Sequence, residues 1–294
     1  MPMKPYAFFI GCQIPARLQQ YEVSARAVLE RLDVELKDFR QFNCCGYPMR
    51  NADEKAFLLS AAKNIALAER AGLDILTLCK CCFGSLKAAD HLLKEDHEKR
   101  KEINRHLTSH KLAYGGTVQI KHLLSVLFHD IGVDTVGQAV TRPFKGLKIA
   151  AQNGCHALRP SRVTRFDDPL APVMFDRLIK LTGAESVDWQ MRLECCGAPL
   201  IGVNDGLSAS LMQRKIDDAE TAGARYLCTA CPYCQLQFDA VQETTISGRG
   251  KTHMLPSILF PQLLGVSMGV PKIKLGFEMN RLDISGVDSF LKEE

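Results

Sequence analysis

The sequence has no long apolar run and no strong imbalance of charge. Its 294 residues include 37 basic and 33 acidic side chains, which give a formal net charge of +4. A charge this close to balance does not support a nucleic-acid partner or a polybasic membrane-binding surface. With 46% hydrophobic and 24% charged residues, the composition indicates one large globular domain or two of ordinary size.

Export and membrane signals are also missing. The apolar run near the start, "YAFFIGC", is too short for a signal peptide, and no small-residue cleavage site follows it. The longest apolar stretch, residues 254–270, contains Pro256, Pro261 and Gln262 and falls short of the ~20 residues that a spanning helix needs. We interpret it as a buried helical segment, and we expect a soluble, cytoplasmic protein with no transmembrane segment.

Cysteine, by contrast, is abundant, with 12 in the chain. Ten of them form two matching sets: Cys12, Cys44, Cys45, Cys79 and Cys82 in the first half, and Cys155, Cys195, Cys196, Cys231 and Cys234 in the second. In each set one cysteine precedes an adjacent pair by 31 or 39 residues, and a Cys-x-x-Cys motif follows after 33 or 34 more. In a cytoplasmic protein such thiols favour metal or redox chemistry over disulfides.

The chain is interpreted as an internal duplication. "CCGYP" in the first half matches "CCGAP" in the second, and "AERAG" matches "AETAG". So long a period predicts two homologous domains, and the segment 141–148, with Pro143 and Gly146, is the expected linker. We therefore predict domains at residues 1–142 and 143–294.

Each half shows the same order of expected elements. Strands are expected at 6–12, 34–39 and 73–78, and again at 147–155, 185–190 and 224–229. Helices are expected at 21–32 and 171–183, and another opens at Asn51, with Glu54 in capping-box spacing, and ends at Gly72. Residues 117–133 are predicted to form an amphipathic helix that interrupts the repeat, and 94–106 a solvated helix face.

Alternating strands and helices predict an α/β fold, with a small, mainly parallel sheet flanked by helices in each half. Loops that follow parallel strands meet at one edge of the sheet, where ligands usually bind. The cysteines of each set fall at or near such loops. We therefore expect each set to be gathered in space.

Five thiols in a set exceed the four that zinc or a cubane iron–sulfur cluster takes from a protein. Adjacent cysteines can bind neighbouring irons, or one thiolate can bridge two irons, and the following glycine permits close approach of the backbone. Soft thiolates exclude hard cations but leave iron–sulfur, zinc and copper(I) open. A cluster with crowded irons is the favoured interpretation at each set, and zinc at one of them is an alternative.

Cys81 and Cys228 have no counterpart in the other half. A lone cysteine is usually a small buried hydrophobe, and we expect this of Cys228, which lies in a predicted strand. Cys81 is flanked by members of the first set, so both ligation and simple burial are open for it.

The repeated cysteine pattern resembles the cysteine-rich CCG domain, and the whole chain is similar to the B-subunit family of heterodisulfide reductases. The resemblance extends to five further sequence segments: "YAFFIGC", "CCFGSLKAADHLL", "NGCHALRPS", "CPYCQLQFDAVQ" and "QLLGVSMG". The resemblance implies two noncubane 4Fe-4S clusters at the domain interface, one on each set of five cysteines. Cys81 departs from the family, which tends to have another residue there.

The resemblance also implies an iron–sulfur catalytic subunit that interconverts a disulfide and its thiols. The family's substrate is the coenzyme M–coenzyme B disulfide in methanogens, or a lipoyl group or other small thiol in sulfur-oxidising complexes. Its partners in the complex are a ferredoxin-like iron–sulfur subunit, which delivers the electrons, together with a flavin-bearing subunit. Disulfide reduction takes two electrons and yields two thiolates, which suits two one-electron centres.

Several residues outside the two sets are candidates for a role. His156, which directly follows Cys155, is the candidate catalytic proton donor, and a structural hydrogen-bonding role is equally open. Arg159 and Arg162 could pair with an anionic substrate, although most loop arginines face water. The same caution applies to Lys80.

Electron transfer within a fumarate reductase, or within a glycolate or lactate oxidase, is the alternative function. Subunits of that kind share the CCG domain and often add a Cys-x2-Cys-x2-Cys cubane motif, which this sequence lacks. A separate partner would then carry the electrons. A zinc-bound structural protein is a third possibility, and the surplus of thiols argues against it.

Overall fold

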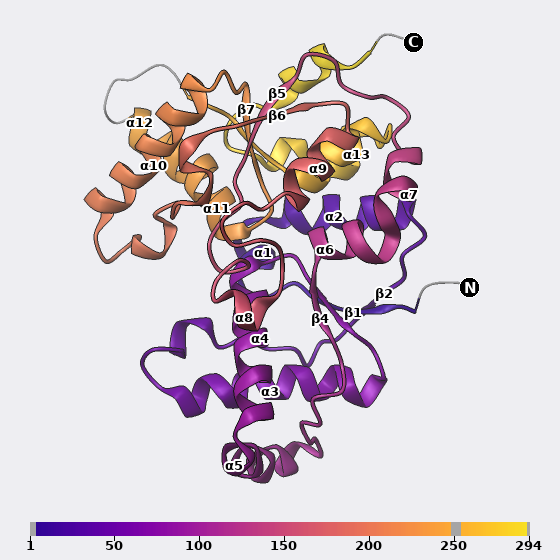
Figure 1. Ribbon diagram of the computed structural model, residues 1–294, viewed down its shortest axis with the longest axis vertical. Helices are drawn as coiled ribbons and strands as arrows, with labels where there is room; N and C mark the ends of the chain where they lie inside the picture. Colours follow the sequence, from indigo (N-terminus) through magenta and orange to yellow (C-terminus); the bar gives the residue numbers. More distant parts are fainter. Residues whose placement is uncertain (1–3, 248–253, 293–294) are drawn as a thin grey trace.

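The computed structural model describes residues 4–247 and 254–292 (Figure 1). Each half of the chain builds a parallel sheet of four strands with helices packed around it, which confirms the duplicated α/β fold. The strand orders, β2-β1-β3-β4 and β6-β5-β7-β8, are equivalent.

The elements alternate in the same way in both halves. The first contains β1 (Tyr6–Phe9), α1 (Gln13–Arg17), α2 (Gln19–Arg31), β2 (Leu36–Asp38), α3 (Glu54–Ala71), β3 (Ile75–Thr77), α4 (Lys80–Glu95), α5 (His97–Leu107), β4 (Ile120–His122), α6 (Leu123–Ser125), a π-helical segment (Val126–Gly132) and α7 (Val133–Gln138). The second contains β5 (Lys148–Ala151), α8 (Ser161–Thr164), α9 (Met174–Leu181), β6 (Glu185–Val187), α10 (Asp205–Thr221), β7 (Tyr226–Thr229), α11 (Pro232–Leu236), a π-helical segment (Gln237–Val241), α12 (Gln242–Ser247), β8 (Ser257–Leu259) and α13 (Phe260–Ser267).

The central strands are short and apolar because helices cover both faces of each sheet. All four residues of β1 and all three of β3 are buried. In the parallel register Ala7 faces Ile75 across this pair, and Ile149 faces Tyr226 in the second sheet. The sheets therefore form the core from which the cysteine-bearing loops extend.

The expected helix at 117–133 is wrong at its beginning. Ile120–His122 instead forms β4, which pairs with β3 through Ile75 and Ile120. A short apolar run satisfies either a helix or a buried strand, and here the open edge of β3 supplies the backbone hydrogen bonds that select the strand. The duplication thus continues where the sequence suggested an interruption.

The segment 254–270 needs a similar correction. Ser257–Leu259 forms β8 beside β7, and only Phe260–Ser267 is helical. All of α13 is buried, as the sequence predicted for this segment. Strand followed by helix at the end of each half is therefore the common pattern.

The start of α3 also differs from its expected position. Its N-cap is Asp53, whose side chain accepts a hydrogen bond from the Ala56 amide at 2.9 Å, and not Asn51. Gly72 ends the helix in the left-handed conformation, as predicted. The solvated helix at 94–106 is confirmed as α5, although Asp96 separates it from α4.

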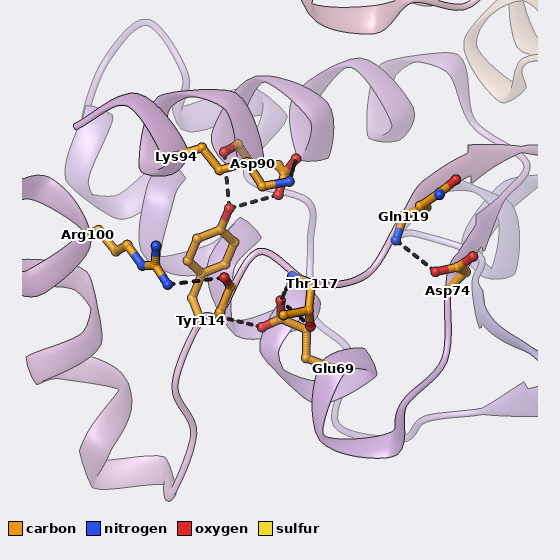
Figure 2. A network of polar contacts seen from close by, with 9 residues as sticks. Glu69, Asp74, Asp90, Lys94, Arg100, Tyr114, Thr117 and Gln119 are labelled. Atoms are coloured by element: carbon orange, nitrogen blue, oxygen red, sulfur yellow. Dashed lines mark hydrogen bonds and ion pairs between the residues drawn. The ribbon is translucent and has the colours of Figure 1, made fainter. Parts of the chain in front are cut away.

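The loop between α5 and β4 is held by a polar network (Figure 2). The Glu69 carboxylate accepts hydrogen bonds from the amides of Gly115 and Thr117 at 2.7 and 2.6 Å. The Tyr114 hydroxyl donates to Asp90, and the Gln119 amide donates to Asp74 at 2.8 Å. These contacts fix the position of the loop just before β4, where Ile120 pairs with Ile75 of β3.

The two halves are packed closely together. In Figure 1, α2 of the first half lies beside α13 of the second, and these helices are in contact. The Nδ1 atom of His122 accepts from the Leu124 amide, so its Nε2 donates, to the Leu78 and Ala230 carbonyls at 3.2 and 3.1 Å. This imidazole joins the strands that precede the two Cys-x-x-Cys motifs.

The expected linker packs against the second half. Thr141 and Arg142 donate their amides to the Ser267 carbonyl, and Phe144 is buried. The boundary at residues 142 and 143 stays a prediction. Among the residues that the structure describes, no helix is both long and apolar enough to cross a bilayer.

Candidate metal centre

The cysteines lie in loops that follow the strands of each sheet, as predicted. Cys12 follows β1 and precedes α1, and the pair Cys44-Cys45 follows β2. Cys79 follows β3 and is the N-cap of α4, where its sulfur accepts from the Cys82 amide at 3.4 Å. The parallel sheet thus collects residues that lie far apart in the sequence at one edge.

Four thiols of the first set form a continuous chain of contacts. The Cys45 thiol lies close enough to those of Cys44 and Cys82 for each to affect the pKa of the other, and the same holds for Cys82 and Cys79. Cys12 is the exposed member of this set. A small cavity bordered by all five of these cysteines also touches Tyr47 and Tyr233.

The second set forms the same kind of chain. Cys195 is in hydrogen-bonding contact with Cys155 and Cys196. Cys234 connects Cys196 to Cys231 in turn. Each of the five thiols predicted to act together in the second half therefore lies near at least one other member of its set.

The two sets meet at the interface between the halves. The sulfurs of Cys79, Cys81 and Cys231 all lie within 4.8 Å of one another, and all three residues are buried. Cys81, whose role the sequence left open, therefore lies at the junction of the sets. Cys228 lies in β7 and is fully buried, as expected.

Comparison with known proteins agrees with this geometry. The family model described as "Cysteine-rich domain" matches residues 6–87 and 149–239. The chain is 34% identical to the B subunit of the ferredoxin/F(420)H(2)-dependent CoB-CoM heterodisulfide reductase of Methanosarcina acetivorans, over 95% of this chain and 94% of that protein. The chain belongs to the B-subunit family of heterodisulfide reductases.

Other relatives of this B-subunit family member carry different names. A protein of Archaeoglobus profundus, described as like the heterodisulfide reductase B subunit, is 31% identical, over 91% of each chain. The "8-methylmenaquinol:fumarate reductase membrane anchor subunit" of Wolinella succinogenes is also 31% identical, over 95% of this chain and 98% of its own.

A solved structure supports the fold of this B-subunit family member. A hypothetical protein from Helicobacter pylori superposes with a TM-score of 0.75 at 17% identity, over 97% of this chain. The present chain spans about half of that protein, 53% of its length. This likeness concerns the fold alone.

Within each set of this heterodisulfide reductase homologue the pKa values of the thiols are shifted in opposite directions: hydrogen bonds between thiols lower the pKa of some members, while the same bonds and burial raise it for others, such as Cys82 and Cys234. Hydrogen bonds from Cys44 and Cys82 lower the pKa of Cys45 to about 3. Hydrogen bonds from Cys155 and Cys196 lower the pKa of Cys195 to about 2. In each set at least one thiol is therefore favoured in the thiolate form, which is the form that binds a metal.

The loops also fit an iron–sulfur group. Gly46 and Gly197 after the cysteine pairs have φ angles of +83° and +89°, which favour glycine. A Cβ atom on Gly11 would lie 2.9 Å from the Cys82 sulfur. Soft sulfur donors and backbone that approaches them closely are what such a group requires.

His156 lies between thiols at the interface. Its Nδ1 is 3.3 Å from the Cys81 sulfur and 3.5 Å from the Cys155 sulfur, and its Nε2 is 3.3 Å from the Tyr47 hydroxyl. Burial lowers its pKa below the usual value. Arg159 and Arg162 are exposed, and their pairing with a substrate stays a prediction.

Sequence reasoning missed Tyr47, Tyr233 and Lys215. The two tyrosine rings lie 6.1 Å apart beside the first set, and Tyr47 meets His156 edge to face. Lys215 is completely buried behind the loop that carries Cys195. The repeat contained a signal for Lys215, because it occupies the position of Asn64 in the first half.

Proposed function

We propose that the chain is the iron–sulfur catalytic subunit of a complex that interconverts a disulfide and its thiols. Two noncubane 4Fe-4S clusters are its cofactors, one on each set of five cysteines. The observation that carries the proposal is the meeting of both sets at Cys79, Cys81 and Cys231. Bound there, iron–sulfur groups would supply single electrons and a Lewis acid for sulfur.

The arrangement matches the stoichiometry of the reaction. A disulfide takes up two electrons and two protons and gives two thiols. Iron–sulfur groups held by the two adjacent cysteine sets would supply one electron each, and the closeness of Cys79 to Cys231 would keep both groups near a single sulfur–sulfur bond. Separate sites on distant surfaces would not permit this.

His156 is the proposed proton donor to a thiolate product. The supporting observation is its ring between the sulfurs of Cys81 and Cys155, with Tyr47 on its other nitrogen. Disulfide turnover that is undiminished in H156Q would remove His156 from this role.

The substrate and partners follow from the relatives. Named relatives act on the coenzyme B–coenzyme M disulfide, and a lipoyl group or another small thiol is the alternative substrate. The proposed partners are a ferredoxin-like iron–sulfur subunit, together with a flavin-bearing subunit. Ten thiols that serve as proposed cluster ligands and not as disulfides would suit a reducing, cytoplasmic location.

A second function is supported by the Wolinella succinogenes relative, a subunit named for quinol:fumarate reduction. In that case the chain would transfer electrons without cleaving a disulfide. Turnover of coenzyme B–coenzyme M disulfide or of lipoamide by the purified complex distinguishes the two functions. Fumarate reduction with no disulfide turnover would favour the second.

The iron content tests the cofactors directly. Anaerobically purified protein should contain about eight irons per chain, since two four-iron clusters are proposed. An oxidised sample should give an electron paramagnetic resonance signal that changes when a substrate thiol is added. Stoichiometric zinc with little iron would contradict the proposal.

Two cysteine variants make the test specific. C196S removes one thiol of the second set, and we expect it to lose about half of the iron. C228S changes a buried cysteine outside both sets, so its iron content should equal that of the wild type. Equal iron in both variants would mean that Cys196 is not a ligand.

A further inference from the structure

Two lysines are buried in the interior next to the cysteine sets. The exposed fraction of Lys215 is 0% and that of Lys80 is 2%. In the part of the chain that the structure describes, no carboxylate forms an ion pair with either ammonium group. A buried charge without an acidic partner is costly, and a negative group held by the adjacent cysteines would offset that cost.

Lys215 reaches from α10 to the loop before the second cysteine pair. Its Nζ donates to the carbonyls of Met191 and Glu194, the latter at 3.1 Å, and lies 4.6 Å from the Trp189 ring centroid. Burial lowers the pKa of Lys215 to about 8, and the charges that Cys234 and Cys196 would carry as metal-bound thiolates raise it. The ammonium group of Lys215 is therefore held behind the loop that carries the second cysteine pair, where it would interact with negative charge on that set.

The equivalent position in the first half carries a neutral side chain. Asn64 and Lys215 are separated by the same 151 positions as Cys44 and Cys195. The side-chain amide of Asn64 donates to the backbone carbonyls of Asn43 and Cys44 at 3.3 and 3.1 Å. Asparagine and lysine thus support the same loop in the two halves, and they differ in charge.

Lys80 adds a second cation to the same side. It begins α4 in the first half, but its Nζ donates across the interface to the carbonyls of Gln152 and Asn153 at 3.2 and 2.6 Å. Gln152 also donates its side-chain amide to the sulfur of Cys234, a member of the second set, at 3.9 Å. The counterpart of Lys80 in the second half is Pro232, which carries no charge, so the second half places no lysine beside the first set from that position.

We propose that Lys215 and Lys80 make the centre on the second cysteine set the more oxidising of the two. A fixed positive charge favours the reduced, more negative state of a nearby redox group. The first electron to reach the protein would then reduce the centre on the second set. The disulfide would lie between two centres with unequal reduction potentials. Both lysines act through their charge on the reduction potential of this centre, and neither contacts the substrate. This inference rests on the proposed iron–sulfur function.

Reciprocal exchange of the paired residues tests the inference. The full chain is purified anaerobically, and the two midpoint potentials are measured by redox titration with electron paramagnetic resonance detection. In the wild type we expect two separated midpoints. K215N should lower the higher one, and N64K should raise the lower one, each by about 59 mV, a tenfold change in a one-electron equilibrium.

Two further variants separate charge from structure. K215R keeps the positive charge and should retain the wild-type separation of the midpoints. K80M removes the second cation and should also lower the higher midpoint. If K215N loses iron through misfolding, N64K and K80M still decide the question.

The outcomes distinguish this inference from the proposed function. Coincident wild-type midpoints, or unchanged midpoints in K215N, N64K and K80M at full iron content, would overturn the charge asymmetry and leave the iron–sulfur function intact. Absence of iron in the wild-type protein would overturn the proposed function itself.

Discussion

Gly84 lies where the two halves approach each other most tightly beside the candidate centre. It belongs to α4 and is buried, and a Cβ atom placed on it would lie 2.5 Å from the His156 carbonyl oxygen. Glycine inside a helix costs about 1 kcal/mol relative to alanine, so another requirement must maintain it here. That requirement is the passage of the His156 loop over the helix.

We therefore expect G84A to lower the free energy of unfolding by about 1–3 kcal/mol, because the added methyl group overpacks the interface. The matched control is G137A in α7, where a Cβ would meet only Leu181 at an ordinary 3.7 Å. Urea unfolding should show G137A to be neutral or slightly stabilised. Equal stabilities of the two variants would contradict the close contact at Gly84.

At the scale of elements, caps and pairing partners decide where a helix or strand begins. In the sequence, the three-residue spacing from Asn51 to Glu54 favoured Asn51 as the cap. In the structure Asp53 has the extended backbone of an N-cap and binds the Ala56 amide. The amides of Ala52 and Asp53 donate to the Met49 carbonyl at the end of the 3₁₀ turn Tyr47–Met49. The chain at Asn51 therefore still belongs to a turn, and α3 begins later.

Replacing the true cap should weaken α3. D53A is expected to lower the free energy of unfolding by about 1 kcal/mol, because one helical amide loses its acceptor. N51A should change it by less than about 0.5 kcal/mol, since Asn51 is exposed. Chemical unfolding of both variants checks this, and a larger effect at Asn51 would restore the cap expected from the sequence.

The whole molecule depends on contacts that join its halves, and His122 is one that responds to pH. Burial, followed by the charge of Lys80, lowers the pKa of His122 to about 3. In the unfolded chain a histidine has a pKa of about 6.5. Below that pH the unfolded state binds a proton that the folded state does not, so stability is complete above about pH 6.5 and declines towards about pH 3.

This contribution should amount to about 1.4 kcal/mol for each pH unit below about 6.5. Between about pH 6.5 and 5 the free energy of unfolding of the wild type should fall by about 2 kcal/mol more than that of H122Q. Urea unfolding across this pH range measures the difference. Parallel pH profiles would show that His122 does not control the acid stability.

The sequence by itself determined the duplicated α/β fold, the two cysteine sets and the loops that carry them. These features depend on local periodicity and on spacing within each half, which a single chain displays directly. It could not separate a short buried strand from a helix at Ile120–His122, because the edge of β3 makes that choice.

Only the tertiary structure decided what lies between the halves. Cys81 was an isolated extra cysteine in the sequence, and packing placed it against Cys79 and Cys231. In the sequence Lys80 was a candidate without a defined role and Lys215 was not singled out, and folding buried both on the side of the second set. The physical reason is that burial and electrostatic environment depend on residues brought together by folding, and no local pattern encodes them.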